Sequence, residues 1–178
     1  MGVRILDLGC GNRKQKNALG ADINRNSQAD VICNLEIFPY PFKDNSFDRV
    51  LCHSILEHLD DIVGVMKEIH RILKPGGVVE IITPHFSSLY SWDDPTHRHH
   101  FSSNSFDYFT TSTSMESQAK GTFEIIKKKI IFGKGILDWL WQFFANKFVH
   151  YYERRWAFIF PAFDLYFELK AIKDELLR

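Results

Sequence analysis

The first half of the chain alternates short apolar runs with polar turns, the pattern of an open α/β sheet. An apolar run opens the chain, a second ends at Asp22, and a third covers residues 29–36. A fourth run ends just before His53, and a fifth covers residues 78–83. Residues 60–74 carry apolar side chains at helical spacing, and a Lys-Pro-Gly-Gly sequence predicts the end of that helix.

The second half is rich in aromatic residues, with 12 of the 16 phenylalanines after residue 100. Residues 123–132 and 165–172 are expected to form strands, with a helix over 136–149 between them. The expected helix has a polar and an apolar face, formed respectively by Asp138, Gln142, Ala145 and Asn146 and by Leu137, Trp141, Phe144 and Phe148. The aromatic stripe of Trp139, Trp141, Phe143 and Phe144 is expected to pack on the sheet or to form a dimer surface; a lid over an apolar acceptor, or a helix at a lipid surface, is the alternative. No run reaches the ~20 residues that span a bilayer.

The turn after the first run has the features of a nucleoside site. Gly9 and Gly11 lack side chains, so the backbone can adopt positive φ angles and approach a ligand closely. Asp7 places a carboxylate at the strand end, and Asp22 suits a bidentate contact to the two ribose hydroxyls. A nicotinamide dinucleotide is a weaker candidate, because the third glycine and the helix start that bind a pyrophosphate are missing.

Five sequence blocks between residues 3 and 84 occur in the order typical of one enzyme family. They are Leu-Asp-Leu-Gly-Cys-Gly, Ala-Asp-Ile, Asp-Asn-Ser-Phe-Asp, Leu-Glu-His-Leu and Leu-Lys-Pro-Gly-Gly. The chain therefore resembles the class I S-adenosylmethionine-dependent methyltransferases, particularly the group similar to the ubiquinone/menaquinone-biosynthesis methyltransferases. This resemblance implies an α/β fold: a Rossmann-like, seven-stranded, mostly parallel sheet with an antiparallel C-terminal hairpin. The aromatic helix would be an insertion, and residues 1–178 one methyltransferase domain with a donor-binding half (1–84) and an acceptor-side half (85–178).

The resemblance also implies which residues bind S-adenosyl-L-methionine, the expected cofactor. They are Asp7, Leu8, Gly9, Cys10, Gly11 and Asn12 around the amino acid part, Asp22 at the ribose, Ile23, Asn34 and Leu35 at the adenine, and His53 near the methionine part. Asn34 departs from the acidic residue usual in the family, although its amide oxygen can still accept a hydrogen bond. Glu57 and His58 are interpreted as the start of the following helix rather than as substrate contacts.

Two departures from the family concern the cover of the donor site. Only about nine residues, 12–20, separate the first two strands, whereas a full crossover with its helix needs at least ~10–12. The first helix should therefore be short or irregular. The upstream helical segment that many family members place over the donor is also missing, so either the site is more open or another segment covers it.

Catalysis is expected after the fifth strand, in a loop with four of the eight histidines. Transfer to a hydroxyl or ammonium group needs a base, and histidine titrates near the required pH. His85 and His97 are the predicted bases, with Asp94 to orient them.

A zinc or iron site from these residues with His99 and His100 is an alternative, but the histidines lack the spacing that places two ligands on one helix face, so no metal is predicted. A structural loop that caps a helix near Ser102 or Ser105 is another.

Composition limits the partners. The 22 basic and 22 acidic residues balance, so no overall field favours nucleic acid. The three cysteines lack zinc-ligand spacing and an even count, and together with the absence of a visible signal peptide they favour the cytoplasm.

The predicted function is methyl transfer to a small or lipid-like acceptor, at oxygen or nitrogen, with a homodimer or peripheral membrane contact through the aromatic region. A non-catalytic S-adenosylmethionine-binding module or partner subunit is the alternative.

Overall fold

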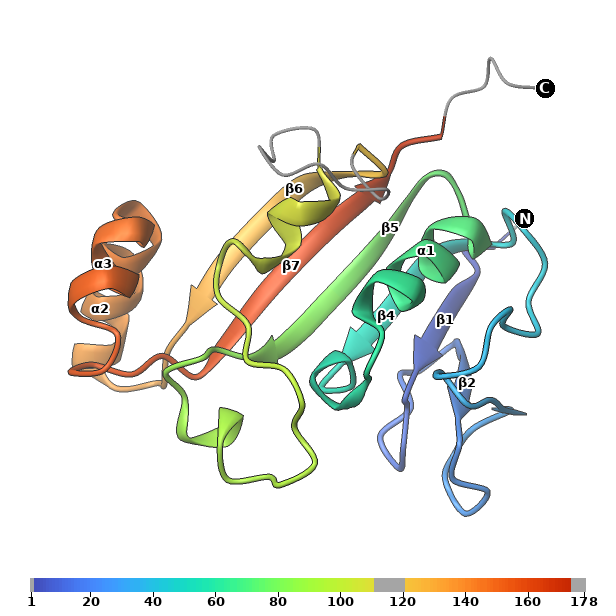
Figure 1. Ribbon diagram of the computed structural model, residues 1–178, viewed down its shortest axis with the longest axis horizontal. Helices are drawn as coiled ribbons and strands as arrows, with labels where there is room; N and C mark the ends of the chain where they lie inside the picture. Colours follow the sequence, from blue (N-terminus) through green and yellow to red (C-terminus); the bar gives the residue numbers. More distant parts are fainter. Residues whose placement is uncertain (1, 111–120, 174–178) are drawn as a thin grey trace.

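The computed structural model describes residues 2–110 and 121–173, which form one seven-stranded sheet (Figure 1). The strands are β1 (Ile5–Leu8), β2 (Ala18–Asp22), β3 (Val31–Ile32), β4 (Phe47–His53), β5 (Leu73–Pro84), β6 (Phe123–Ile131) and β7 (Asp164–Ala171). The helices are α1 (Ile62–Ile72), α2 (Ile136–Lys147) and α3 (Val149–Arg155), with short 3-10 segments η1 (Leu56–His58), η2 (Leu89–Ser91) and η3 (Ser105–Phe109).

The strand order is β3-β2-β1-β4-β5-β7-β6, and β7 is the strand that runs against the rest. β1 pairs in parallel with β2 and β4, β2 with β3, and β4 with β5, whereas β7 is antiparallel to both β5 and β6. The carboxyl ends of the parallel strands therefore share one edge, the lower one in Figure 1, where ligands bind in open α/β sheets. The predicted mostly parallel, seven-stranded sheet is confirmed.

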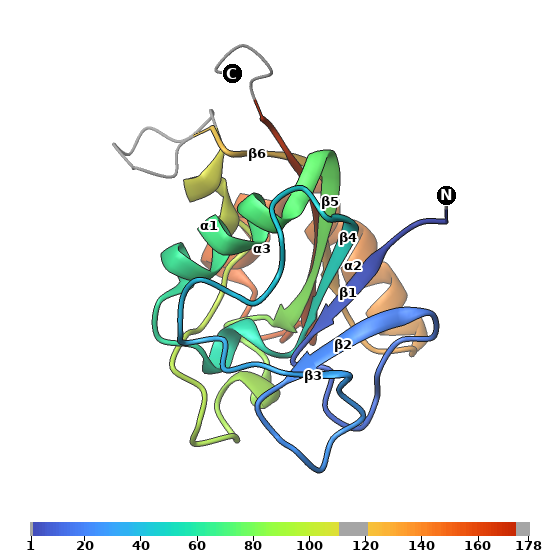
Figure 2. The same ribbon diagram turned by 90° about the vertical axis from the view of Figure 1, so that its right-hand side faces the viewer.

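Helix α1 covers one face of this sheet (Figure 2). Its N-terminus is capped by Asp61, whose carboxylate accepts the Gly64 N–H at 2.8 Å. Val65, Met66 and Ile69 are fully buried, so the apolar stripe seen in the sequence faces the core. The helix begins and ends within the predicted residues 60–74.

The structure differs from the sequence prediction at two connections. β3 has only two residues, because only Val31 and Ile32 pair with β2 in the segment 29–36. β5 begins at Leu73, before the Lys-Pro-Gly-Gly sequence, since Leu73 already pairs with Phe47 and a register shift separates this pair from the rest of the strand. The segment between β1 and β2 forms turns and no helix, in agreement with the predicted compression.

The predicted aromatic helix is two helices, α2 and α3, separated at Phe148, whose φ of −129° and ψ of 53° interrupt the helical path. α2 lies beside the edge strand β6 and attaches to it through its polar face. The Asn146 side chain accepts the Ile130 N–H and donates to the Ile130 carbonyl, both at 2.8 Å. Trp139 and Phe143 point away from the sheet, 66% and 64% exposed. Packing of the whole aromatic stripe on the sheet is therefore not observed.

Candidate functional site

A cleft of about 230 Å³ lies at the carboxyl ends of β1, β2 and β3. Its lining residues are Gly9, Asp22, Ile23, Cys33, Asn34, Leu35, Glu36, Ile55, His58 and Leu59. They come from the ends of three strands and from the segment around η1. Most of these side chains are apolar, and Asp22 and Glu36 add carboxylates. The cleft therefore combines apolar walls with groups that accept hydrogen bonds.

The glycine turn of the cleft has the predicted backbone conformation. Gly9 has φ +66° and Gly11 has φ +49°, the left-handed region that favours glycine. A Cβ atom on Gly9 would also come within 2.6 Å of Ile55 Cδ1 and 2.8 Å of Ile55 Cβ. The absence of a side chain at Gly9 thus allows Ile55 to pack against the turn and form a wall of the cleft.

Asp22 connects the glycine turn to the next loop. One carboxylate oxygen accepts the Gly11 N–H and the other the Asn24 N–H, each at 2.8 Å. A carboxylate offers about four lone-pair positions, so two remain for a ligand. Because both oxygens are held by backbone donors, the carboxylate is oriented in advance at the mouth of the cleft.

Several predicted donor residues do not line the cleft with their side chains. The side chains of Asp7, Leu8 and Cys10 are buried beneath the turn, while Asn12 is exposed. Asp7 accepts the Gln15 N–H at 2.8 Å, which fixes the segment that replaces the first crossover helix. Burial raises the pKa of the Asp7 carboxyl. Asp7 thus organises the turn from below and does not line the cleft.

The remaining predicted donor residues divide into two groups. Ile23, Asn34 and Leu35 line the cleft, and the Asn34 side-chain oxygen accepts the Glu36 N–H at 3.0 Å. His53, at the end of β4, is not among the lining residues. Its Nε2 contacts a Glu80 carboxylate oxygen at 2.7 Å. His53 therefore stays a predicted contact to the methionine part, outside the adenosine portion of the cleft.

Beside this cleft, the structure brings together Glu57, His58 and His97. One ligand atom from each residue lies within 4.8 Å of the others, and the two imidazole centroids are 4.6 Å apart. Burial raises the pKa of the Glu57 carboxyl, whereas burial and the neighbouring His97 lower the pKa of His58. The Asp94 carboxylate accepts the Thr96 hydroxyl at 2.7 Å and so acts on His58 through Thr96, whereas the Asp94 backbone carbonyl accepts the His97 N–H at 3.2 Å.

His85, the other predicted base, has no exposed surface. Its Nδ1 contacts the Ser87 hydroxyl at 2.8 Å, and its Nε2 contacts Glu153 of α3 at 3.3 Å. Glu153 also accepts the Ser103 N–H at 2.7 Å. The geometry gives His85 a position that joins the end of β5 to α3, out of reach of an acceptor in this conformation.

Comparisons with known proteins agree with this geometry. A family model described as a methyltransferase domain matches residues 6–81. Cycloartenol-C-24-methyltransferase of Arabidopsis thaliana is 25% identical over 175 residues, which cover 83% of this chain and 52% of that protein. A demethylmenaquinone methyltransferase of Staphylococcus epidermidis is 42% identical over 57 residues, 29% of this chain and 24% of that protein. A solved S-adenosylmethionine-dependent methyltransferase from Archaeoglobus fulgidus has a TM-score of 0.61 at 18% identity, covering 94% of this chain and 86% of that one.

Residues 6–81 therefore match a methyltransferase domain, and the described residues have the fold of solved S-adenosylmethionine-dependent methyltransferases. The likeness to the solved structure shows the fold alone. The chain spans about half the length of the Arabidopsis protein and a smaller share of the staphylococcal one, so its acceptor does not follow from theirs.

The cleft fits S-adenosylmethionine, the cofactor of this class. Ile23, Leu35 and Leu59 provide apolar walls of the kind that enclose an adenine ring. The oriented Asp22 carboxylate has the chemistry to accept hydrogen bonds from both ribose hydroxyls. Gly9 lines the cleft beside these groups, and the contact of Gly9 and Gly11 with the part of the donor beyond the ribose stays a prediction. The residues that line the cleft thus fit the chemical groups of a nucleoside.

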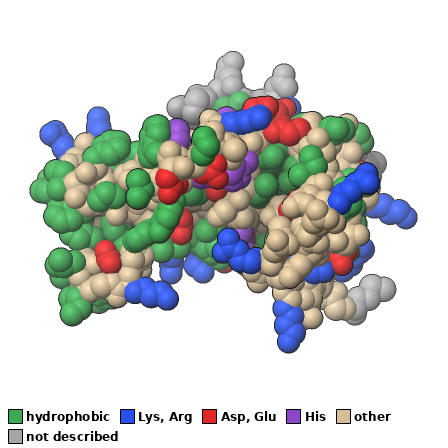
Figure 3. All heavy atoms as spheres, turned by 90° about the horizontal axis from the view of Figure 1, so that it is seen from below, with side chains coloured by type: hydrophobic (Ala, Val, Ile, Leu, Met, Phe, Trp, Pro, Cys, Tyr) green, Lys and Arg blue, Asp and Glu red, His purple; other side chains and the backbone are tan. Residues whose placement is uncertain are grey.

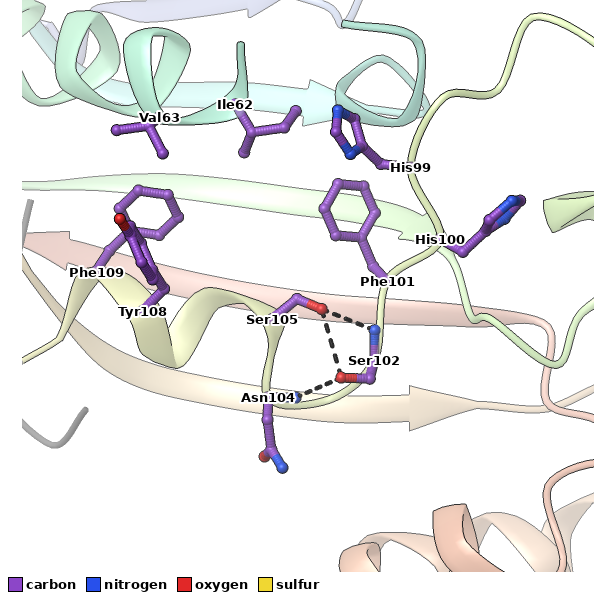
Figure 4. Close-up of a pocket in the computed structure, with 10 residues that line it drawn as sticks. All are labelled: Ile62, Val63, His99, His100, Phe101, Ser102, Asn104, Ser105, Tyr108 and Phe109. Atoms are coloured by element: carbon purple, nitrogen blue, oxygen red, sulfur yellow. Dashed lines mark hydrogen bonds between the residues drawn. The ribbon is translucent and has the colours of Figure 1, made fainter. Parts of the chain in front are cut away.

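A second cavity, of about 410 Å³, lies between α1 and η3 (Figure 4). Ile62 and Val63 of α1 face Phe101, Tyr108 and Phe109 across it. α1 begins three residues after Leu59, which lines the donor cleft. The protein therefore has a second, mostly apolar cavity, close in sequence to the cleft at the ends of β1, β2 and β3.

The position of Glu57 differs from the sequence interpretation. The sequence places Glu57 and His58 at the start of the following helix, but α1 begins at Ile62 and Glu57 is 1% exposed in η1. The missed signal was an acidic residue between Leu56 and Leu59, both of which are buried. A carboxylate between two core positions is costly unless it has a partner, which points to a specific role.

Proposed function

We propose that this protein transfers the methyl group of S-adenosylmethionine to a small or lipid-like acceptor, at an oxygen or nitrogen atom. The observation that carries the proposal is the cleft in which the Asp22 carboxylate, fixed by two backbone N–H groups, stands beside apolar walls. When bound, the cofactor supplies an electrophilic methyl group on a sulfonium. Asp22 orients the ribose, and Ile55 and Leu59 exclude water from the adenine end.

The lipid-like nature of the acceptor is supported by the apolar cavity between α1 and η3. The named relatives include a cycloartenol and a demethylmenaquinone methyltransferase. We propose that the apolar part of the acceptor occupies this cavity, with its reacting atom toward His97. His97 remains the predicted base for that atom, and Asp94 orients its neighbour His58 through Thr96.

The test is calorimetric titration with S-adenosylmethionine and with S-adenosylhomocysteine. We expect Asp22→Ala to weaken both affinities by about 10- to 100-fold, through loss of a charge-assisted contact of ~1.5–3 kcal/mol. The affinities of Asp22→Asn, which keeps one oxygen acceptor, should lie between those of the wild type and of Asp22→Ala. Asp44→Ala is the matched control, since its exposed carboxylate pairs with Arg71 away from the cleft. Unchanged affinity in Asp22→Ala, or no affinity in the wild type, would refute the donor site.

The exposed face of α2 is a second surface with a possible function. In the alternative, a cofactor-binding module or partner subunit, this face would be the docking surface. Five large apolar side chains of this helix are at least half exposed: Ile136, Leu137, Trp139, Leu140 and Phe143. They belong to the hydrophobic end of the molecule, on the left in Figure 3. Lys134 and Lys147 are exposed at the two ends of this face. Apolar surface flanked by lysines is typical of helices that lie at a lipid interface.

We propose that this face of α2 contacts a lipid surface from the cytoplasm and brings the enzyme to a lipid-like acceptor. No helix among the described residues is both long and apolar enough to cross a bilayer. Sedimentation with vesicles of mixed anionic and neutral lipid tests the contact. Trp139→Ser with Phe143→Ser should abolish sedimentation, and Trp92→Ser, exposed elsewhere, should leave it intact. Loss of a dimer in sedimentation velocity, without change in vesicle binding, would instead assign the face to a second copy of the chain.

A further inference from the structure

Two segments 40 residues apart in sequence are held together around Glu57 by backbone hydrogen bonds. The Glu57 carbonyl accepts the Arg98 N–H at 2.8 Å and the His99 N–H at 3.3 Å. These bonds place His97, from the loop after β5, beside η1, which carries Glu57 and His58. The arrangement does not depend on the side chains of the three residues, so their convergence is built into the backbone.

Both imidazoles are oriented so that the same nitrogen remains available. His97 Nδ1 lies 3.2 Å from the Ser91 carbonyl, which can only accept, so this nitrogen carries the proton. The Thr96 hydroxyl donates to Asp94 and therefore accepts from His58 Nδ1 at 2.9 Å. Each neutral ring is left with an Nε2 lone pair. Ring N–H groups held by a carbonyl or by a carboxylate-linked hydroxyl are the usual second layer around histidine metal ligands.

Glu57 contributes a carboxylate that the described protein does not fully satisfy. The side chain is 1% exposed, and one oxygen, Oε2, accepts the Thr83 hydroxyl at 3.1 Å. The other, Oε1, has no hydrogen-bond partner among the described residues. A buried carboxylate oxygen without a partner is costly, and a bound cation would remove that cost.

We propose that Glu57, His58 and His97 bind a divalent transition-metal ion. Two imidazole nitrogens and one carboxylate oxygen within 4.8 Å of one another suit Zn²⁺, Fe²⁺ or Co²⁺ and leave coordination positions open. This set differs from the histidine-rich loop set considered from the sequence, because two of its three ligands come from η1.

The ion would lie at the edge of the donor cleft, because His58 also lines that cleft. Its role rests on the proposed function. An acceptor hydroxyl on an open position would lose its proton to water more readily. Its oxygen would then form the bond to the methyl carbon as the carbon–sulfur bond breaks, with the electron pair remaining on sulfur. With Nε2 on the metal, His97 would act as a ligand rather than as the base.

The experiment is a titration of chelator-treated full-length protein with Co²⁺, followed by visible absorption and calorimetry. We expect one equivalent to bind with d–d bands, and His97→Gln and Glu57→Gln to weaken it at least 10-fold. His99→Gln is the matched control, since His99 lies on the same loop but its Nε2 contacts the Asp60 carbonyl. Absence of saturable Co²⁺ binding, or equal binding by wild type and both ligand variants, would overturn the proposal.

Titration of the same samples with S-adenosylhomocysteine separates this inference from the proposed function. Donor-product binding without Co²⁺ binding would refute the metal site and leave methyl transfer standing. Co²⁺ binding that requires His97, without donor-product binding, would support the metal site and count against methyl transfer. Because burial of Glu57 makes Glu57→Gln a risk for folding, His97→Gln, which alters a half-buried side chain, decides the outcome if the former variant unfolds.

Discussion

Gly9 and Gly11 offer a controlled test of how the donor turn is built. Both have positive φ angles, so alanine at either position meets the same backbone strain. They differ in their surroundings. A Cβ atom at Gly9 would overlap Ile55, whereas at Gly11 it would meet no atom within 4 Å. Any difference between the two alanine variants therefore measures the contact between the turn and Ile55.

The expected magnitudes follow from these two terms. Placing alanine in the left-handed region costs the folded state ~1–2 kcal/mol, and this is the one folded-state cost expected for Gly11→Ala. Gly9→Ala adds an overpacking cost of ~1–3 kcal/mol, because Ile55 is branched at the Cβ that it would contact. The gain from a less flexible unfolded chain, ~0.4–1 kcal/mol, is common to both variants and cancels. Gly9→Ala should thus lower the free energy of unfolding by about 1–3 kcal/mol more than Gly11→Ala.

The assay is urea unfolding of both variants, repeated in an Ile55→Gly background. Ile55→Gly removes all the atoms that overlap, including Cβ, so the difference between the two glycine variants should disappear in that background. The coupling between Gly9→Ala and Ile55→Gly is then ~1–3 kcal/mol. Equal destabilisation by the two glycine variants in the wild-type background, or a difference that persists without the Ile55 side chain, would refute this account of the turn.

Two further predictions concern the attachment of α2 and α3. Burial raises the pKa of Glu153, but its contacts with His85 and Ser103 lower that pKa more. The ionised Glu153 side chain therefore stabilises the folded protein above the unfolded pKa near 4.5, and this stabilisation is lost as the pH falls through the lower folded pKa. Glu153→Gln should lower the free energy of unfolding by about 1–3 kcal/mol at neutral pH and by less in acid, as measured by urea unfolding; an equal loss at neutral and at acid pH would contradict this. Asn146→Ala should speed hydrogen exchange at the Ile130 amide at least 10-fold, from loss of ~1–3 kcal/mol, while amides paired between β6 and β7 stay protected; unchanged exchange at Ile130 would contradict the attachment.

The glycine turn and the carboxylate at the end of β2 could be predicted because their signals are local. A glycine that needs a positive φ angle, or an aspartate at the end of a strand, reveals its role within a few residues. The sequence could not indicate that Asp7 is buried under the turn while Asp22 lies at the mouth of the cleft. Both are acidic residues at strand ends, and only the path of the chain after Gly11 separates them.

The acceptor half was harder to predict because its contacts are long range. His85 and His97 are similar residues on one loop, yet the first is enclosed by Glu153 of α3 and the second lies beside Glu57 of η1. Each assignment depends on which distant segment packs against the loop. The partner of His97 is fixed by the backbone hydrogen bond from the Arg98 N–H to the Glu57 carbonyl, and no pattern of side chains in the sequence predicts such a bond.

The orientation of α2 shows the same limit and bears on function. Hydrophobic periodicity predicts that the aromatic face turns inward, since burying a large apolar side chain stabilises by ~1.5–3 kcal/mol. The structure instead uses Asn146 to satisfy the edge strand at Ile130, a net gain of about 1 kcal/mol per hydrogen bond. The monomer thus leaves the burial of Trp139 and Phe143 unrealised. A surface that takes up these side chains would recover more free energy than the edge contacts provide, which is why we propose that this face contacts a lipid surface rather than solvent alone.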